Sequence, residues 1–215
     1  MNASLVFSRG AFLWGILVIM DYFHYTYKHN HIDFSSHIYK VSTYHYNWHG
    51  ETEILILLKG RIEMSCNSEV FTMEPLDTII ISPQVGHATL ALEQDTTALV
   101  IHVGKDFFQQ FDPNFSMYQF MIRSDETNRY NSFFTSVRHH AAMMMLLMVD
   151  GKSPANQLWL EHHYLDLASV VYSEIEAVKS IPSNTKPADM TEATFDKMIA
   201  YIDKNYQRKI ELEDI

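Results

Sequence analysis

The chain has 215 residues, a formal net charge of −10 and one cysteine, Cys66. This length allows one well-packed domain plus an appendage, because compact domains usually take roughly 100–200 residues. Hydrophobic residues make up 47% of the chain, which excludes wholesale disorder. A single cysteine has no partner for an internal disulfide, so we expect a reducing, cytoplasmic environment. The acidic stretch 51–100 is excluded as a nucleic-acid surface, because such surfaces are basic.

An apolar run, residues 11–20, stands near the N-terminus. It is too short to cross a membrane core of roughly 30 Å as a helix, and no small-residue cleavage site follows it. We therefore expect no membrane partner. We take Met20 as the natural start and residues 1–19 as an upstream extension, with a targeting segment as the alternative.

Short apolar runs broken by turn residues fill the chain from residue 36 to about 104. Such runs predict successive strands. The expected strands are 37–44, 52–59, 61–66, 69–73, 77–82, 87–92 and 97–103. No helical pattern lies between them, which excludes a doubly wound parallel sheet and predicts an antiparallel sandwich or barrel over 36–125.

Beyond Gly104 the pattern becomes helical. We expect a short helix at 105–112, a further strand at 117–122, and helices at 126–149 and 154–179, the last begun by Ser153 as cap and Pro154. The last helix carries two apolar rows: Leu160, Tyr164, Leu167, Val171, Ile175 and Val178 in one, and Leu158, Leu165, Ala168 and Tyr172 in the other. Such a helix is either deeply buried or packs on its own domain and on a partner. We expect the second row to form a homodimer interface within residues 126–180.

Two clusters of polar residues resemble the paired motifs of the cupin family. The first runs from His49 through Glu53 to Gly60, and the second from Asp77 through Pro83 to His87. In an extended chain, positions 45, 47, 49, 51 and 53 would share one face and turn it into the barrel. The resemblance implies a jelly-roll barrel in which a His, a Glu and a later His hold a metal.

The chain departs from the metal-binding version of these motifs at two positions. Asn47 stands where a further metal-binding histidine would be, and Leu76 replaces the glycine before Asp77. We therefore expect no metal and no cofactor. A facial triad of His49, Glu53 and His87, in a metal-dependent isomerase or dioxygenase, is the alternative.

Aromatic and polar side chains around these motifs suit a small-molecule pocket at the mouth of the barrel. A carbohydrate would fit an aromatic face with convergent polar groups. The candidate ligand-binding residues are Tyr44, Tyr46, Trp48, His49, Glu53, His87, Thr89 and His102. For each of them, a satisfied core side chain is the competing interpretation.

The tail, residues 198–215, reads MIAYIDKNYQRKIELEDI and is similar to the opening of the DNA-binding module of AraC-type transcription regulators. A barrel, two helices and a polar linker at 181–190 precede it, in the order that this family shows. The resemblance implies that 191–215 begins a helix-turn-helix module, with DNA contacted only by the part beyond Ile215. It also implies that residues 1–35 form an arm over the ligand, with His24, His29 and His31 as contacts.

The sequence thus predicts an α+β protein: a cupin-like antiparallel barrel, a helical dimerisation segment, and the truncated start of a helical DNA-binding module. We expect a bacterial regulator that senses a small-molecule effector and is not an enzyme. The alternatives are the metal-dependent cupin enzyme and a dimerisation scaffold that binds no ligand.

Overall fold

The computed structural model describes residues 22–41, 45–151 and 153–179, together with Tyr201. The chain divides into two compact units, residues 1–181 and 182–215. The predictions for the N-terminal extension 1–19, the linker 181–190 and the DNA-binding segment 191–215 therefore lie outside the described residues, except at Tyr201, which is helical.

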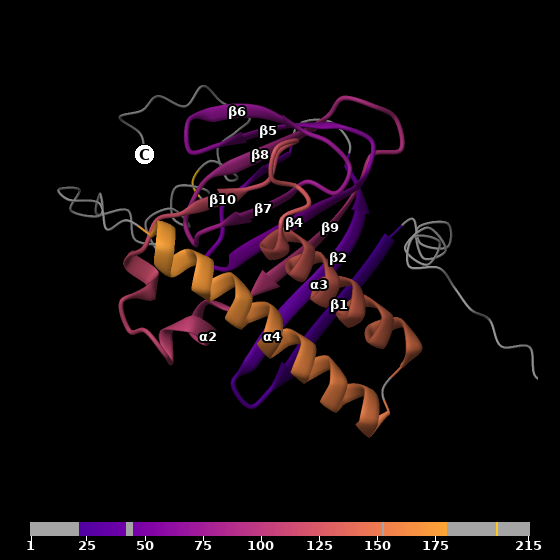
Figure 1. Cartoon of the computed structure of the whole chain (residues 1–215), viewed down its shortest axis with the longest axis vertical. Coiled ribbons are helices and arrows are strands. Elements are labelled where there is room, and N and C mark those ends of the chain that lie inside the picture. Colours follow the sequence, from indigo (N-terminus) through magenta and orange to yellow (C-terminus); the bar gives the residue numbers. More distant parts are fainter. Residues whose placement is uncertain (1–21, 42–44, 152, 180–200, 202–215) are drawn as a thin grey trace, which may run out of the picture. The chain divides into compact units, whose positions relative to one another are not determined.

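Among the described residues of the first unit, ten strands form two antiparallel sheets. The larger sheet has the order β1-β2-β9-β4-β7-β10, and the smaller has the order β3-β8-β5-β6 (Figure 1). The strands are β1 (Tyr22–His29), β2 (Ile32–Lys40), β3 (His45–Asn47), β4 (Thr52–Lys59), β5 (Ile62–Cys66), β6 (Glu69–Met73), β7 (Thr78–Ile81), β8 (His87–Ala91), β9 (Thr97–Val103) and β10 (Met121–Arg123). The predicted α+β fold with an antiparallel, cupin-like barrel is confirmed.

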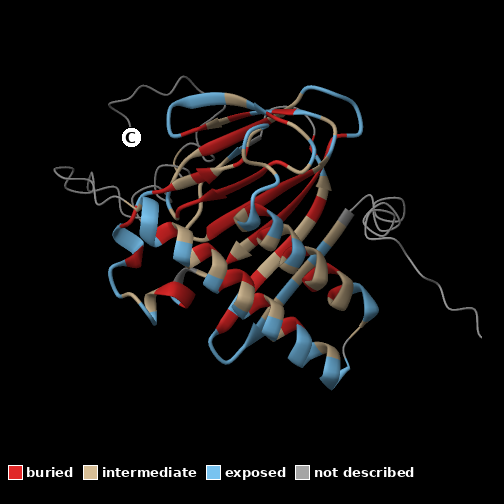
Figure 2. Cartoon of the chain, in the orientation of Figure 1, coloured by how far each residue is buried: buried red, intermediate tan, exposed pale blue. Residues whose placement is uncertain are grey.

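Alternation along β4 separates two hydrophobic cores. Leu55 and Leu57 point between the two sheets, where they pack with Met64 of β5. Ile54 and Ile56 point to the other side and join the core that the helices cover. Strand β4 is buried on both faces, as Figure 2 shows for the centre of the larger sheet.

Helices α3 (Ser132–Asp150) and α4 (Pro154–Val178) form an antiparallel pair across the outer face of the larger sheet (Figure 1). As predicted, Ser153 caps α4 by accepting a hydrogen bond from the backbone N–H of Asn156, and Pro154 stands at the start. The first apolar row of α4 is buried from Leu160 to Ile175, whereas Val178 is exposed. The remaining elements are a short helix α2 (Lys105–Gln109) and the 3-10 turn η1 (Phe115–Met117).

The prediction of an N-terminal arm up to residue 35 is wrong for the described residues. Strands β1 and β2 pair in register from Tyr22 opposite Tyr39 to His29 opposite Ile32, so the first strand does not begin at 37. Phe23, Tyr25 and Tyr27 alternate with polar residues and pack against the helix-side core. This alternation of aromatic and polar residues is the sequence pattern of a strand with one buried face.

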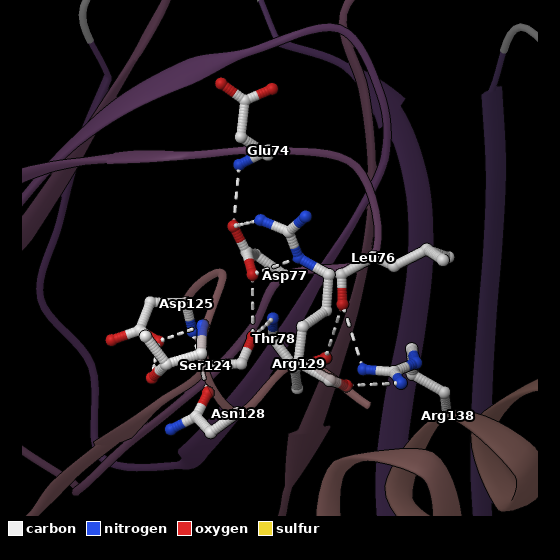
Figure 3. A network of polar contacts seen from close by, with 10 residues as sticks. Glu74, Leu76, Asp77, Thr78, Ser124, Asp125, Asn128, Arg129 and Arg138 are labelled. Carbon is white, nitrogen blue, oxygen red and sulfur yellow. Dashed lines mark hydrogen bonds and ion pairs between the residues drawn. The ribbon is translucent and has the colours of Figure 1, made fainter. Parts of the chain in front are cut away.

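A buried ion pair fastens β7 to the segment before α3. Arg129 donates two hydrogen bonds to the Asp77 carboxylate, each 2.8 Å long, and Ser124 Oγ donates a third (Figure 3). Leu76 precedes this carboxylate with φ of 72°, in the left-handed region that glycine adopts without strain. Leu76, which replaces the glycine of the motif, therefore adopts the backbone conformation that a glycine would adopt there. Arg138 Nη1 donates to the Leu76 carbonyl and holds the turn.

Candidate functional site

The chain from residue 45 to 53 is not one extended segment, so the condition for a shared face is not met. Strand β3 ends at Asn47, β4 begins at Thr52, and the two strands belong to different sheets. The face shared by alternate residues is therefore not what brings the motif together. Instead, the bend between the sheets carries His49 back over β4, and its side chain meets Glu53.

Three imidazoles converge on one oxygen of the Glu53 carboxylate. The Nε2 atoms of His49 and His102 each lie 3.0 Å from Glu53 Oε2, and the Nε2 atom of His87 lies 3.3 Å from it. These residues come from the β3–β4 bend, β4, β8 and β9, so both sheets contribute. Glu53 and His87 are buried, whereas the side chains of His49 and His102 are 22% and 24% exposed. Two of the three imidazoles are therefore partly exposed.

The other ring nitrogen of each histidine lies near an oxygen outside the cluster. His87 Nδ1 donates to the Val85 carbonyl at 3.0 Å, which fixes Nδ1 as the protonated nitrogen because a carbonyl only accepts. His102 Nδ1 lies 3.4 Å from Ser35 Oγ, and His49 Nδ1 lies 3.5 Å from Glu51 Oε2. The contacts of His87 and His102 orient their rings so that Nε2 points inward, whereas His49 Nδ1 is buried without a hydrogen-bond partner.

The electrostatics of the cluster favour an ionised Glu53. Burial raises the pKa of this carboxyl, but hydrogen bonds from His102 and His49 and the proximity of His87 outweigh it and hold the pKa well below its usual value. For His87, burial lowers the pKa, and the Glu53 carboxylate with the Val85 carbonyl overcomes this and raises it. The buried charge of Glu53 is thus balanced by its imidazole neighbours.

A row of polar side chains extends from this cluster across the inner face of the larger sheet. Ser35 Oγ lies 3.2 Å from His37 Nε2 and so links His37 on β2 to His102 on β9. His24 on β1 stacks on His37 with ring centroids 4.3 Å apart. Sequence reasoning missed His37 and Ser35. Their alternation with Phe34, Ser36 and Ile38 would have shown them once β2 was extended back to Ile32.

The remaining predicted ligand residues are dispersed. Thr89 is buried on β8, two residues from His87, and Trp48 is half-buried in the bend. Tyr46 is 55% exposed, and its hydroxyl lies over Gly86, where a Cβ would come within 2.2 Å of Tyr46 Oη. Tyr44 lies outside the described residues.

The predicted arm histidines do not meet at the cluster. His24 is exposed on β1 and reaches it only through His37. His29 Nδ1 lies 2.6 Å from Glu161 Oε1 of α4, and His31 is an exposed turn residue. His29 therefore joins the strand pair to a helix.

The predicted dimerisation row is only partly available at the surface. Leu158 is 71% exposed and Leu165 is 46% exposed, but Ala168 is buried within its own unit, so Ala168 as an interface contact is wrong. Tyr172 is half-buried and donates to Asp112 Oδ2 at 2.8 Å. Leu165, Ala168 and Tyr172 line a groove of about 310 Å³ with Phe107, Phe108 and Phe111.

The residues of the cluster fit a divalent metal ion, although we expected none. One ligand atom from each of His49, Glu53 and His87 lies within 4.8 Å of the others. His87 Nε2 is buried without a hydrogen-bond partner, and a lone pair facing a carboxylate is unfavourable unless a proton or a cation lies between them. A histidine that donates Nδ1–H to a carbonyl is also the usual form of a metal ligand.

Comparisons with known proteins return cupin-domain structures. No family model matches the chain, and no curated protein is significantly similar to it in sequence. A cupin 2 domain-containing protein from Halorhodospira halophila is 17% identical, with 40% of this chain and 65% of that chain covered and a TM-score of 0.33. KdgF from Halomonas sp. is 15% identical over 39% of this chain and 78% of that chain, with a TM-score of 0.32. A cupin 2 conserved barrel domain protein from Salinispora arenicola is 14% identical over 43% of this chain and 82% of that chain, with a TM-score of 0.35.

Among the described residues, no helix has the length and apolar character needed to span a membrane. The two-sheet topology defines a cupin-like barrel, and its histidine–carboxylate cluster defines the candidate site.

Proposed function

We propose that the barrel binds a small-molecule effector at the Glu53 cluster and is the sensing part of a transcription regulator similar to the AraC type. One observation carries the proposal. Adjacent residues of β4 face the two places that a sensor must connect: Glu53 points into the barrel, and Ile54 points into the core beneath α3 and α4. A ligand that contacts Glu53 on one face of β4 is therefore one residue away from Ile54, which packs in the core beneath the helices on the other face.

The partly exposed imidazoles of His49 and His102 suit a polar, uncharged ligand. A hydroxyl group can donate to the Glu53 carboxylate and accept from the His49 or His102 ring in the same position. Trp48 offers aromatic surface in the neighbouring bend, whereas Tyr46 pairs with Ala88 and lies on the opposite face from His87. A sugar or another polyhydroxylated metabolite combines these properties.

Closely packed side chains connect the larger sheet to the helices. Met145 of α3 belongs to the same core as Ile54 and accepts a contact from Ser36 Oγ of β2, 3.4 Å from its sulfur. A bound ligand alters the helix pair only if it prefers one arrangement of this core over another. Dimerisation through Leu158 and Leu165 would carry such a preference to the two DNA-binding modules that the AraC resemblance implies.

A metal-dependent cupin enzyme is the second candidate, and the convergence of three Nε2 atoms on Glu53 favours it. His49, Glu53 and His87 would hold the ion, and His102 Nε2 stands beside them. A bound divalent metal would supply a Lewis acid that polarises an oxygen of the substrate. In such an enzyme, the Val85 carbonyl would orient the His87 imidazole and the Ser35 hydroxyl would orient that of His102.

Thermal unfolding tests the sensor proposal. The full chain is screened against sugars, sugar acids and other polyhydroxylated metabolites, first as metal-free protein and then with Mn²⁺, Fe²⁺ or Zn²⁺. We expect at least one compound to raise the Tm without metal, because a ligand at a hundred times its Kd adds about 2.7 kcal/mol. The same compound should change backbone amide exchange in α3 and α4. Absence of any stabilising compound would contradict the proposal.

Metal content separates the two candidates. The sensor requires no metal for effector binding, whereas the enzyme requires stoichiometric metal that is lost in both His49→Gln and His87→Gln. Elemental analysis of purified wild-type protein, with the exposed His31→Gln as matched control, measures this. Compound binding that occurs only with metal present would favour the enzyme over the sensor.

A further inference from the structure

A second group of metal-ligating side chains lies on the helix pair, outside the barrel. His140 of α3 and His163 and Asp166 of α4 each present one ligand atom, and these atoms lie within 4.8 Å of one another. His140 Nδ1 is 3.2 Å from His163 Nδ1 and 3.9 Å from Asp166 Oδ2. All three residues are half-buried, so the group is neither solvated freely nor closed to solvent.

Helix geometry brings these residues together. His163 and Asp166 are three residues apart and therefore share one face of α4. The antiparallel partner α3 brings His140 against that face about as far from the interhelical loop as His163 is. Neighbouring imidazoles extend the group: the exposed His139 precedes His140 and contacts its ring, and His162 Nε2 lies 3.4 Å from Asp166 Oδ2.

The distances match the ligand spacing of a four-coordinate metal. Two imidazole nitrogens bound to Zn²⁺ at about 2.05 Å with a tetrahedral angle lie roughly 3.3 Å apart. The observed 3.2 Å between His140 Nδ1 and His163 Nδ1 agrees with this value. Asp166 Oδ2 lies within 4.8 Å of both nitrogens, and His162 stands beside it as a further nitrogen donor.

We propose that His140, His163 and Asp166 form a binding site for a divalent transition metal of the zinc class, which links α3 to α4. Mixed imidazole and carboxylate ligands are those that Zn²⁺, Ni²⁺ and Cu²⁺ accept in proteins.

A metal at this site would act on helix α4, which packs on the barrel and also carries the exposed residues Leu158 and Leu165. His163 is adjacent to Tyr164, which packs on Phe34 of β2, and Leu165 follows on the exposed side. A metal between the helices restrains their separation at this level. This inference concerns residues outside the barrel and stands whether the barrel binds an effector or not.

Zn²⁺ titration of the full, metal-free chain tests the proposal, with a chromophoric chelator as competitor. We expect micromolar or tighter binding to wild type, and His140→Gln and Asp166→Asn should each weaken it by about tenfold or more. Exposed His31→Gln is the matched control and should stay within about twofold of wild type. His49→Gln removes a ligand of the barrel cluster, so a second class of Zn²⁺ that disappears only in this variant belongs to the barrel.

Thermal unfolding provides the second readout. Zn²⁺ should raise the Tm of wild type and of His49→Gln but not that of His140→Gln. Asp166→Asn changes a side chain that is 44% exposed, so it tests the site even if His140→Gln fails to fold. The proposal would be overturned if Zn²⁺ bound both His140→Gln and Asp166→Asn with wild-type affinity, or if it bound wild type no tighter than millimolar.

Discussion

His102 and Glu53 stand directly opposite each other on neighbouring strands β9 and β4, with Nε2 of the one 3.0 Å from Oε2 of the other. This register pair places a titratable imidazole and a buried carboxylate on the inner side of the larger sheet. His49 and His87 reach the same oxygen from the bend and from the smaller sheet. The cluster therefore depends on the correct closure of both sheets.

His37 should make the protein less stable as the pH falls. Burial, followed by the proximity of His24 and His102, lowers the pKa of His37 from 6.5 to about 4. Below pH 6.5 the unfolded chain takes up a proton at this residue that the folded chain does not, so the free energy of unfolding falls toward pH 4. His37→Gln should reduce this slope in urea unfolding measured at a series of pH values. His31→Gln is the control. A slope of His37→Gln equal to that of wild type would contradict the prediction.

The buried Asp77–Arg129 pair should be costly to break. Arg129→Met leaves a buried carboxylate without its partner and should lower the free energy of unfolding by about 3–5 kcal/mol. Asp77→Asn combined with Arg129→Met should recover part of this loss. Arg61→Met, which breaks the exposed pair with Glu93, should lower the free energy of unfolding far less, because solvent screens an exposed ion pair. Equal effects of Arg129→Met and Arg61→Met would contradict the structure.

Removing the hydroxyl of Tyr164 should stabilise the protein. Its oxygen is buried without a hydrogen-bond partner, and an unsatisfied buried hydroxyl costs about 1–3 kcal/mol. Tyr164→Phe should therefore raise the free energy of unfolding by about 1 kcal/mol. Tyr27→Phe is the matched control and should lower it, because Tyr27 donates to Glu161. Destabilisation by Tyr164→Phe in chemical denaturation would show that the hydroxyl has a partner.

The exposed side of α4 should hold two chains together. Leu158→Lys and Leu165→Lys place charges on the proposed dimer surface, and each should raise the dimer dissociation constant by about tenfold or more. Val70→Lys changes an apolar side chain of similar exposure, 64%, on β6 and should have no effect. Sedimentation equilibrium measures the constants. A monomeric wild type, or equal association of all variants, would contradict this interface.

The strand pattern of the sequence was sufficient for the barrel. The bounds of β4, β6 and β9 agree with the predicted 52–59, 69–73 and 97–103, because each is a β-branched or apolar run between turn residues. Strand β1 was missed because its histidines, His24 and His29, suggested an arm that contacts the ligand. Asn30, with φ of 52°, makes the turn that the sequence did not reveal as one.

The members of the cluster were predicted better than the reason for their proximity. His49, Glu53, His87 and His102 were all singled out, but the shared strand face invoked for His49 and Glu53 does not exist. Spacing in sequence does not show where a chain leaves one sheet for another. The role of His37 likewise depends on the pairing of β2 with β9, a long-range contact that no local pattern encodes.

The affinity of a stabilising compound for wild type and for Glu53→Gln tests the account most directly. Calorimetric titration of the full, metal-free chain gives both constants, and Glu53→Gln keeps the shape of the side chain while removing its charge. We predict that the substitution weakens binding by about a hundredfold, since a hydrogen bond to a buried charged group contributes about 1.5–3 kcal/mol. Equal affinity of the two proteins would place the ligand elsewhere and contradict the proposed site.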